Sequence, residues 1–230
     1  VRVALSAVWH IFVGAACIVL TPLVGGTVHA AEPSKPNIIY ILADDLGWKD
    51  VGFHGSDIQT PNLDKLAAEG VRLERHYTSP MCTPTRAALM TGRYPMRYGL
   101  QVGVIPGAGT YSLSQDEFLL PQMLKDAGYK TYMSGKWHLG HAKKEFWPNH
   151  RGFDSFYGAT VGEIDHFKHS SHGVDDWYRN DTAIKEVGFD NTLFGAEAVR
   201  LVNAHDGKDP FFLYLAFTAP DTPFQAPQDY

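Results

Sequence analysis

The stretch NIIYIL, at residues 37–42, is a continuous apolar run, and the acids Asp44 and Asp45 follow it closely. An uninterrupted run of branched and aromatic side chains is typical of a strand that is buried on both faces. A second run of this kind, FFLYLAF, occupies residues 211–217. We therefore expect a sheet whose central strands are covered on both sides.

Helix and strand signals alternate between these two runs. Thr60 and Pro61 are typical of the N-cap and first position of a helix, and Gly70 is typical of its end. The other expected elements are a strand at 71–77, a helix at 121–127, a strand at 129–133 and a helix from Asp190 or Thr192 to about Ala204. This alternation predicts an α/β fold with a mostly parallel central sheet flanked by helices. In such sheets, ligands bind beyond the carboxyl ends of the strands.

The composition excludes several classes of protein. The 230 residues include 20 Lys plus Arg and 25 Asp plus Glu, which gives a formal net charge of -5. This mild acidity argues against a nucleic-acid-binding protein, which carries a concentrated basic face. Two cysteines exclude a disulfide-rich scaffold and a four-cysteine zinc site. A hydrophobic content of 44% excludes bulk disorder and is ordinary for a globular protein.

Residues 1–30 have the pattern of a signal peptide. Arg2 is their one formal charge, an apolar stretch follows at 9–24, and the VHA run at 28–30 places small residues where signal peptidase reads them. A transmembrane anchor is the alternative, but a proline and two glycines interrupt the stretch before a comfortable spanning length. We therefore expect a secreted or periplasmic protein without stable membrane insertion, whose mature chain begins near Ala31.

Asp44 and Asp45 stand at the carboxyl end of the first expected strand. Adjacent carboxylates repel each other, and a hard divalent cation relieves the repulsion by taking oxygen ligands from both. A bare pair of aspartates is more often a solvated turn, so the pair alone does not establish a cation site. Two further patterns favour the cation.

The first pattern is the run CTPTR at residues 82–86, which predicts the start of a helix. We expect Thr83 to be the N-cap and Pro84 the first helical residue. Cys82 would then lie at a helix N-terminus, where free N–H groups and the helix dipole favour an anion. Arg86 follows about one turn later and can direct its guanidinium toward the same anion.

The second pattern is the run GKWHLG at residues 135–140, just after the strand expected at 129–133. In extended backbone, Lys136 and His138 point the same way, so a cation and a proton carrier would face one site. Taken singly, such a lysine is more often a surface residue and such a histidine a structural one.

Together these runs resemble the type I sulfatases. The residues that carry the resemblance are Asp44-Asp45, CTPTR at 82–86, TGRYP at 91–95 and GKWHLG at 135–140. Three further runs resemble the arylsulfatase B branch in particular: GFHGSDIQTPNLD at 52–64, RGFD at 151–154 and FLYLAF at 212–217. The similarity extends from about Lys35 to Tyr230.

The resemblance implies a nucleophile that the unmodified side chains do not provide. In this family a formylglycine-generating enzyme converts the cysteine of C-x-P-x-R to formylglycine, which corresponds to Cys82 here. One hydroxyl of the hydrated aldehyde attacks sulfur, and the second allows sulfate to be released. His138 would be the base for that release, while Arg86 and Lys136 would bind the formylglycine and the sulfate oxygens.

The resemblance also implies a calcium ion and a fold. Asp44, Asp45 and the modified Cys82 would be ligands of Ca²⁺, which polarises the hydrate and the sulfate. The fold would be alkaline-phosphatase-like, in agreement with the alternating strands and helices. Residues 31–230 would be the N-terminal part of the catalytic domain, because the remaining metal ligands and a substrate lysine lie beyond Tyr230 in relatives. This segment by itself would be inactive.

Two features depart from the family pattern or stand outside it. Relatives usually have histidine where Asp221 stands, and an aspartate there would repel a sulfate unless it were protonated or turned away. We therefore do not include Asp221 in the expected site. His166, His169 and His172 could line the pocket, but we interpret them as surface-loop histidines on a Gly- and Ser-rich segment.

The leading hypothesis is a secreted, calcium-dependent sulfatase that acts on aryl or carbohydrate sulfates. One alternative is a phosphodiesterase or phosphonate hydrolase of the same superfamily, since related enzymes share the formylglycine motif. The other is a catalytically silent, sulfatase-like protein that binds sulfated glycans. Asp221 supports the silent protein, whereas the intact CTPTR and GKWHLG runs oppose it.

Overall fold

The computed structural model describes residues 35–228 and contains a mixed six-stranded sheet. Its strands, in spatial order, are β1 (Ile38–Leu42), β8 (Phe211–Ala216), β2 (Lys130–Lys136), β3 (Ser155–Ala159), β6 (Tyr178–Arg179) and β7 (Thr182–Ala183). β1, β8, β2 and β3 run parallel, whereas β6 and β7 are antiparallel and extend the β3 edge. β4 (Ser170–Ser171) and β5 (Val174–Asp175) form a separate pair. The predicted mostly parallel sheet is therefore confirmed.

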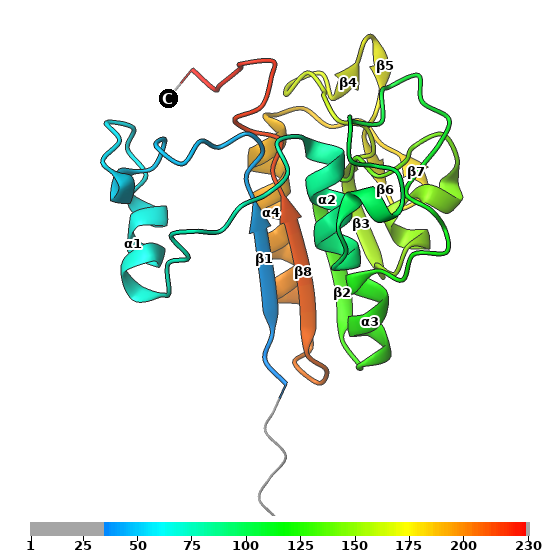
Figure 1. The fold of residues 1–230 in the computed structure, drawn as a ribbon, viewed down its shortest axis with the longest axis horizontal. Helices are drawn as coiled ribbons and strands as arrows, with labels where there is room; N and C mark the ends of the chain where they lie inside the picture. The colour runs from blue at the N-terminus through cyan, green and yellow to red at the C-terminus, as the bar shows by residue number, and fades with distance from the viewer. Residues whose placement is uncertain (1–34, 229–230) are drawn as a thin grey trace, which may run out of the picture. The chain divides into compact units, whose positions relative to one another are not determined.

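Helices cover both faces of this sheet. They are α1 (Pro61–Glu69), α2 (Cys82–Thr91), α3 (Leu120–Asp126) and α4 (Asp190–Ala204), with 3-10 turns η1 (Gly52–His54), η2 (Pro95–Arg97), η3 (Lys144–Phe146) and η4 (Pro148–His150). Figure 1 shows α4 behind the sheet and α2 and α3 in front of it, whereas α1 lies to one side. α1, α3 and α4 begin within one residue of the predicted positions, whereas α2 begins two residues earlier than predicted.

β8 shows why a continuous apolar run forms the centre of such a sheet. Its alternate side chains Phe212, Tyr214 and Ala216 join the core under α2 and α3. Phe211, Leu213 and Leu215 join the second core, under α4. Because successive side chains of a strand point to opposite faces, a strand with a core on each side must be apolar throughout.

β1 has a different environment from the one that its sequence predicts. It is the edge strand of the sheet, and Ile39 and Ile41 are 51% and 52% exposed. Ile38, Tyr40 and Leu42 pack on the core under α2 and α3. The expectation of burial on both faces is therefore wrong for β1, because α4 lies against β8, β2 and β3 and does not extend over the edge.

The strand predicted at 71–77 is also wrong. These residues form turns and irregular backbone, and their side chains are exposed. An isolated extended segment leaves its N–H and C=O groups without ladder partners, and no strand in the described part of the chain pairs with this one.

None of the helices within residues 35–228 is long and apolar enough to cross a membrane. The signal peptide expected at 1–30 lies outside the described residues.

Candidate active site

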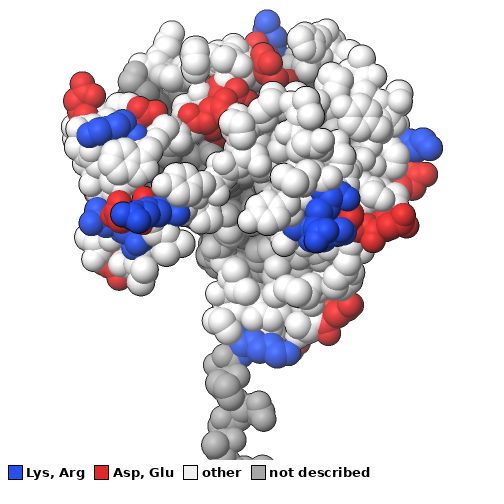
Figure 2. All heavy atoms as spheres, in the orientation of Figure 1, with Lys and Arg blue, Asp and Glu red and all other residues white. Residues whose placement is uncertain are grey.

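The carboxyl ends of β1, β8 and β2 bring together side chains that are far apart in the sequence. The residues at this edge are Asp44, Asp45, Cys82, Arg86, Lys136 and Asp221, which we call the strand-end cluster. The loop after β1 is joined to the loop after β8, since the Asp44 N–H donates to the Ala219 carbonyl at 3.1 Å. In Figure 2, a group of acidic side chains lies in the upper part of the visible face, above the level at which β1 and β8 end in Figure 1.

Lys136 lies at the centre of this cluster. It is the last residue of β2, and its side chain is 1% exposed. Its ammonium contacts the carboxylate of Asp44, lies 3.0 Å from Asp221 Oδ2 and lies 3.6 Å from Cys82 Sγ. A buried ammonium needs such partners, because an unpaired charge in the interior is costly.

Arg86 is the second buried cation of the cluster. Its Nη2 lies 3.3 Å from Asp44 Oδ2, and its Nη1 donates to the Lys136 carbonyl at 2.6 Å and to the Tyr214 hydroxyl at 3.3 Å. Nε and Nη2 are buried without a hydrogen-bond partner within the described residues. The guanidinium is therefore fixed in place while two of its nitrogens keep donors for an anion.

Cys82 begins α2, but not in the way that the sequence predicts. The N-cap is Met81, so the helix starts two residues earlier than expected. The hydroxyl of Thr83 does not cap the helix, because it donates to the His138 carbonyl at 3.0 Å and accepts from the Ile105 N–H at 3.1 Å. Thr83 thus ties α2 to the loop after β2.

The thiol of Cys82 is not activated in this position. Its Sγ lies 3.5 Å from Asp44 Oδ1. Burial raises the pKa of the Cys82 thiol, although Lys136 and Arg86 act in the opposite direction. The thiol is therefore protonated at neutral pH and is a poor nucleophile as it stands.

His138 adopts a backbone conformation that the sequence did not reveal. Its φ is 60°, in the left-handed region, so Lys136 and His138 do not point the same way along an extended strand. His138 Nε2 lies 3.0 Å from the Ile105 carbonyl and must carry the proton of that bond. Nδ1 is buried and has no hydrogen-bond partner in the described part of the chain. Burial, together with Lys136 and Arg86, lowers the pKa of His138 to about 3, so the ring is neutral.

The acids of the cluster suit a hard divalent cation. One donor atom each from Asp44, Asp45 and Cys82 lies within 4.8 Å of the others. Partial burial and the neighbouring carboxylates of Asp221 and Asp44 raise the pKa of Asp45. A cation bound by these oxygens would relieve that repulsion. A pocket of about 440 Å³ opens at these residues.

Asp221, which sequence reasoning excluded, belongs to the cluster. Burial would raise the pKa of this carboxyl, but contact with Lys136 outweighs it and the pKa of Asp221 is lowered. Its position after β8, at the same edge as Asp44, was the signal that could have identified it.

The three loop histidines do not share one environment. His166 and His169 are 1% and 3% exposed, so the surface interpretation is wrong for both. His166 Nδ1 lies 2.9 Å from Asp190 Oδ2, and the ring of His169 stacks on Trp177 with centroids 4.1 Å apart. His172 is exposed, as interpreted.

Comparisons with known proteins agree with this arrangement. A family profile described as Sulfatase matches residues 36–230. Arylsulfatase J of Mus musculus is 45% identical over 210 residues, which cover 87% of this chain and 35% of the relative. N-acetylgalactosamine-6-sulfatase of Mus musculus is 36% identical over 227 residues, which cover 89% of this chain and 44% of the relative.

A solved structure shares the fold. Ps i-CgsB in complex with k-i-k-neocarrahexaose has a TM-score of 0.79 and 38% identity, and the similarity covers 85% of this chain and 48% of that one. The alkaline-phosphatase-like fold that the resemblance implied is thereby confirmed. The chain spans less than half the length of these relatives. Because the family profile extends over nearly every described residue, the chain belongs to the sulfatase family.

Proposed function

We propose that the full-length protein hydrolyses sulfate esters, either aryl or carbohydrate sulfates, at the strand-end cluster. The observation that carries this proposal is the pair of buried cations, Lys136 and Arg86, placed around Cys82. The names of the relatives point to the same reaction class, since they are an arylsulfatase and an N-acetylgalactosamine-6-sulfatase.

Lys136 and Arg86 would bind the sulfate group. The Lys136 ammonium lies 3.6 Å from Cys82 Sγ, so an ester reacting at residue 82 would be in its reach. Arg86 offers Nε and Nη2, which make no hydrogen bond within residues 35–228, although Nη2 also lies 3.3 Å from the Asp44 carboxylate. Charge-assisted donors held in a dry site stabilise negative charge that develops on the transferred group.

Cys82 would act after oxidation to formylglycine. The raised pKa of the thiol argues against an unmodified cysteine nucleophile at neutral pH. Formylglycine would supply a hydrated aldehyde with one hydroxyl to attack sulfur and another to allow the release of sulfate. A formylglycine-generating enzyme would therefore be a partner during maturation.

His138 would take up a proton at Nδ1. Nε2–H is committed to the Ile105 carbonyl, which leaves the Nδ1 lone pair as the basic atom of the ring. The pKa of about 3 keeps this atom unprotonated at neutral pH, so its lone pair is available, and the negative charge of a bound sulfate ester would raise that pKa and make the ring a stronger base.

Asp44, Asp45 and residue 82 would hold Ca²⁺, which would supply positive charge to polarise the sulfate. Residues 31–230 would be the N-terminal part of the catalytic domain. Residues 1–30 would direct the protein to the secretory route or the periplasm.

The test uses full-length protein made together with the formylglycine-generating enzyme. Mass spectrometry of the peptide containing Cys82 should find the aldehyde, and the protein should turn over an aryl sulfate faster than an aryl phosphodiester. Cys82→Ser should remain folded and fail to cycle, because a serine ester lacks the second hydroxyl.

Thr85→Ser is the matched control, since a serine keeps the bond to the Ser79 carbonyl and the variant should retain turnover. An unmodified thiol in fully active protein, or normal turnover by Cys82→Ser, would contradict the proposal.

A further inference from the structure

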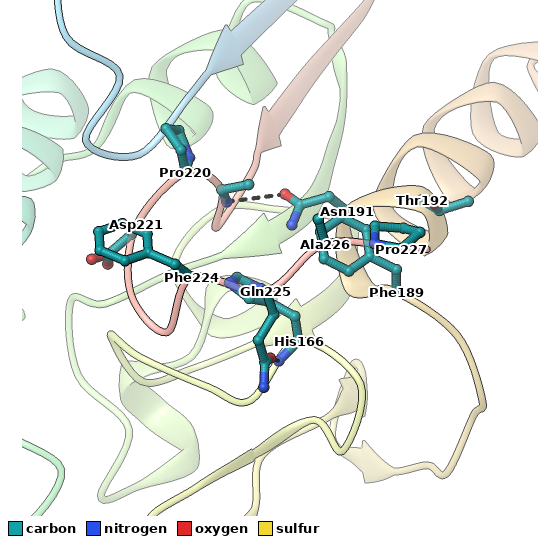
Figure 3. A pocket seen from close by; sticks show the side chains of 11 residues that line it. His166, Phe189, Asn191, Thr192, Pro220, Asp221, Phe224, Gln225, Ala226 and Pro227 are labelled. Atoms are coloured by element: carbon teal, nitrogen blue, oxygen red, sulfur yellow. Dashed lines mark hydrogen bonds between the residues drawn. The ribbon is translucent and has the colours of Figure 1, made fainter. Parts of the chain in front are cut away.

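A second pocket opens beside the strand-end cluster, and Asp221 belongs to both. The pocket has a volume of about 600 Å³ and lies between the loop after β8 and the start of α4. Figure 3 shows the side chains that line it, with Asp221 at one end. Because Asp221 Oδ2 lies 3.0 Å from the Lys136 ammonium, a molecule in this pocket adjoins the proposed sulfate site.

The walls of this pocket are mainly apolar. Phe189 and Phe224 contribute aromatic rings, and Pro220, Ala226 and Pro227 contribute aliphatic surface. Phe224 is 85% exposed, so its ring packs little against other side chains. An exposed aromatic ring at the rim of a pocket is available to a ligand.

The polar side chains of the wall are largely committed to the protein itself. The Asn191 amide donates to Asp190 and Thr218 and accepts from the N–H groups of Thr218 and Ala219. The Gln225 amide accepts from the His166 N–H at 2.8 Å and donates to Asp165 at 3.2 Å.

His166 is held in the same way, through Nδ1, by Asp190. Thr192 contributes a hydroxyl to the wall. The wall therefore offers few hydrogen bonds to a ligand.

We propose that this pocket binds the apolar, ring-bearing alcohol part of a sulfate ester whose sulfate lies on Lys136 and Arg86. This inference rests on the proposed sulfatase function and selects aromatic or fused-ring alcohols over sugars. A sugar buried here would leave several hydroxyls without partners, which costs free energy, whereas an aromatic ring gains from the phenylalanine walls. The volume suits a ligand of two or three fused rings.

The experiment compares two esters on the full-length, matured protein: methylumbelliferyl sulfate and galactose sulfate. The variant is Phe224→Ala, which should fold normally because the ring is exposed. Loss of the ring contact should lower kcat/KM for methylumbelliferyl sulfate about tenfold, mainly through KM. Phe224→Leu should restore part of the loss. Val187→Ala is the matched control, since Val187 is 98% exposed and lies outside the pocket.

The wild-type protein should also prefer methylumbelliferyl sulfate to galactose sulfate, and Phe224→Ala should narrow that preference. Galactose sulfate as the better substrate, or an unchanged KM for the aryl ester in Phe224→Ala, would overturn the pocket assignment.

Binding of the free phenol, methylumbelliferone, separates this inference from the proposed function. We expect saturable binding by fluorescence titration, weakened about fivefold in Phe224→Ala and unchanged in Val187→Ala. If neither ester is hydrolysed but the phenol binds in this way, the sulfatase proposal fails and the apolar pocket stands. If the phenol does not bind, or binds Phe224→Ala equally well, the pocket assignment fails whatever the activity.

Discussion

Gly135→Ala tests the close packing that places Lys136. Gly135 precedes Lys136 in β2 and lies in register with Ala216 of β8 and Gly158 of β3. Its φ is 123°, and a Cβ at this position would lie 1.9 Å from the Ala216 carbonyl oxygen. Because the nearest atoms belong to backbone, a side-chain rotation cannot remove the overlap.

The expected loss of stability has two sources. Holding an alanine at this positive φ costs about 1–3 kcal/mol. Forcing β2 and β8 apart to admit a methyl group costs about 1–3 kcal/mol more, as overpacked cores do. The free energy of unfolding should therefore fall by about 2–6 kcal/mol, a large part of the roughly 5–15 kcal/mol of a typical domain.

Equilibrium urea unfolding, followed by tryptophan fluorescence, measures this change. Gly195→Ala is the matched control, because Gly195 lies inside α4 and a Cβ there meets nothing within 4 Å. Removing a glycine from a helix interior should raise the free energy of unfolding by about 0.5–1 kcal/mol. If Gly135→Ala unfolds at the same urea concentration as the wild type, the packing argument for β2 is wrong.

Three further expectations follow from the buried groups of the site. Tyr214→Phe removes the hydroxyl that accepts a hydrogen bond from Arg86 Nη1. The free energy of unfolding should fall by only about 1 kcal/mol at neutral pH, because Nη1 still donates to the Lys136 carbonyl. Burial raises the pKa of Tyr214 to about 12 in the folded protein, whereas the unfolded chain has the ordinary value near 10. The contribution of Tyr214 to the free energy of unfolding is therefore complete below pH 10 and is lost as pH rises through 12. Unfolding curves should therefore show the wild type losing about 2–3 kcal/mol more than Tyr214→Phe between those pH values. Asp45→Asn should reduce the calcium content of the full-length protein in elemental analysis. Asp57 is an exposed acid outside the cluster, so Asp57→Asn should leave the calcium content unchanged. Equal calcium in the two variants would show that Asp45 is not a ligand.

Local signals predicted the elements whose ends depend on the backbone of a few neighbouring residues. Thr60-Pro61 marks the start of α1 correctly because proline lacks the N–H that a first helical residue leaves unbonded. The FFLYLAF run predicts β8 correctly because a strand between two cores has no solvated face.

Features that depend on distant partners were not predictable in this way. The apolar run of β1 resembles that of β8, but one is an edge strand and the other a central strand, which only the sheet order reveals. The left-handed backbone of His138 follows from its bonds to the Thr160 carbonyl and to Thr83, both remote in sequence. The place of Asp221 in the cluster likewise depends on a distant partner, because Lys136 is 85 residues away in the sequence.

The charges of the strand-end cluster support the proposal that a metal cation and a sulfate ester bind at the same site. Cys82 and His138 add no charge at neutral pH, because burial raises the pKa of the thiol and lowers that of the imidazole. Two cations, Arg86 and Lys136, then face the three carboxylates of Asp44, Asp45 and Asp221, which leaves one negative charge when all three are ionised. A sulfate monoester also carries one negative charge, so the cluster without a metal would repel it. A divalent cation reverses the sign, and the ester then brings the site to neutrality. In the proposed site, the acids that would hold the metal are thus balanced against the cations that would hold the sulfate, and neither set would suit the substrate without the other.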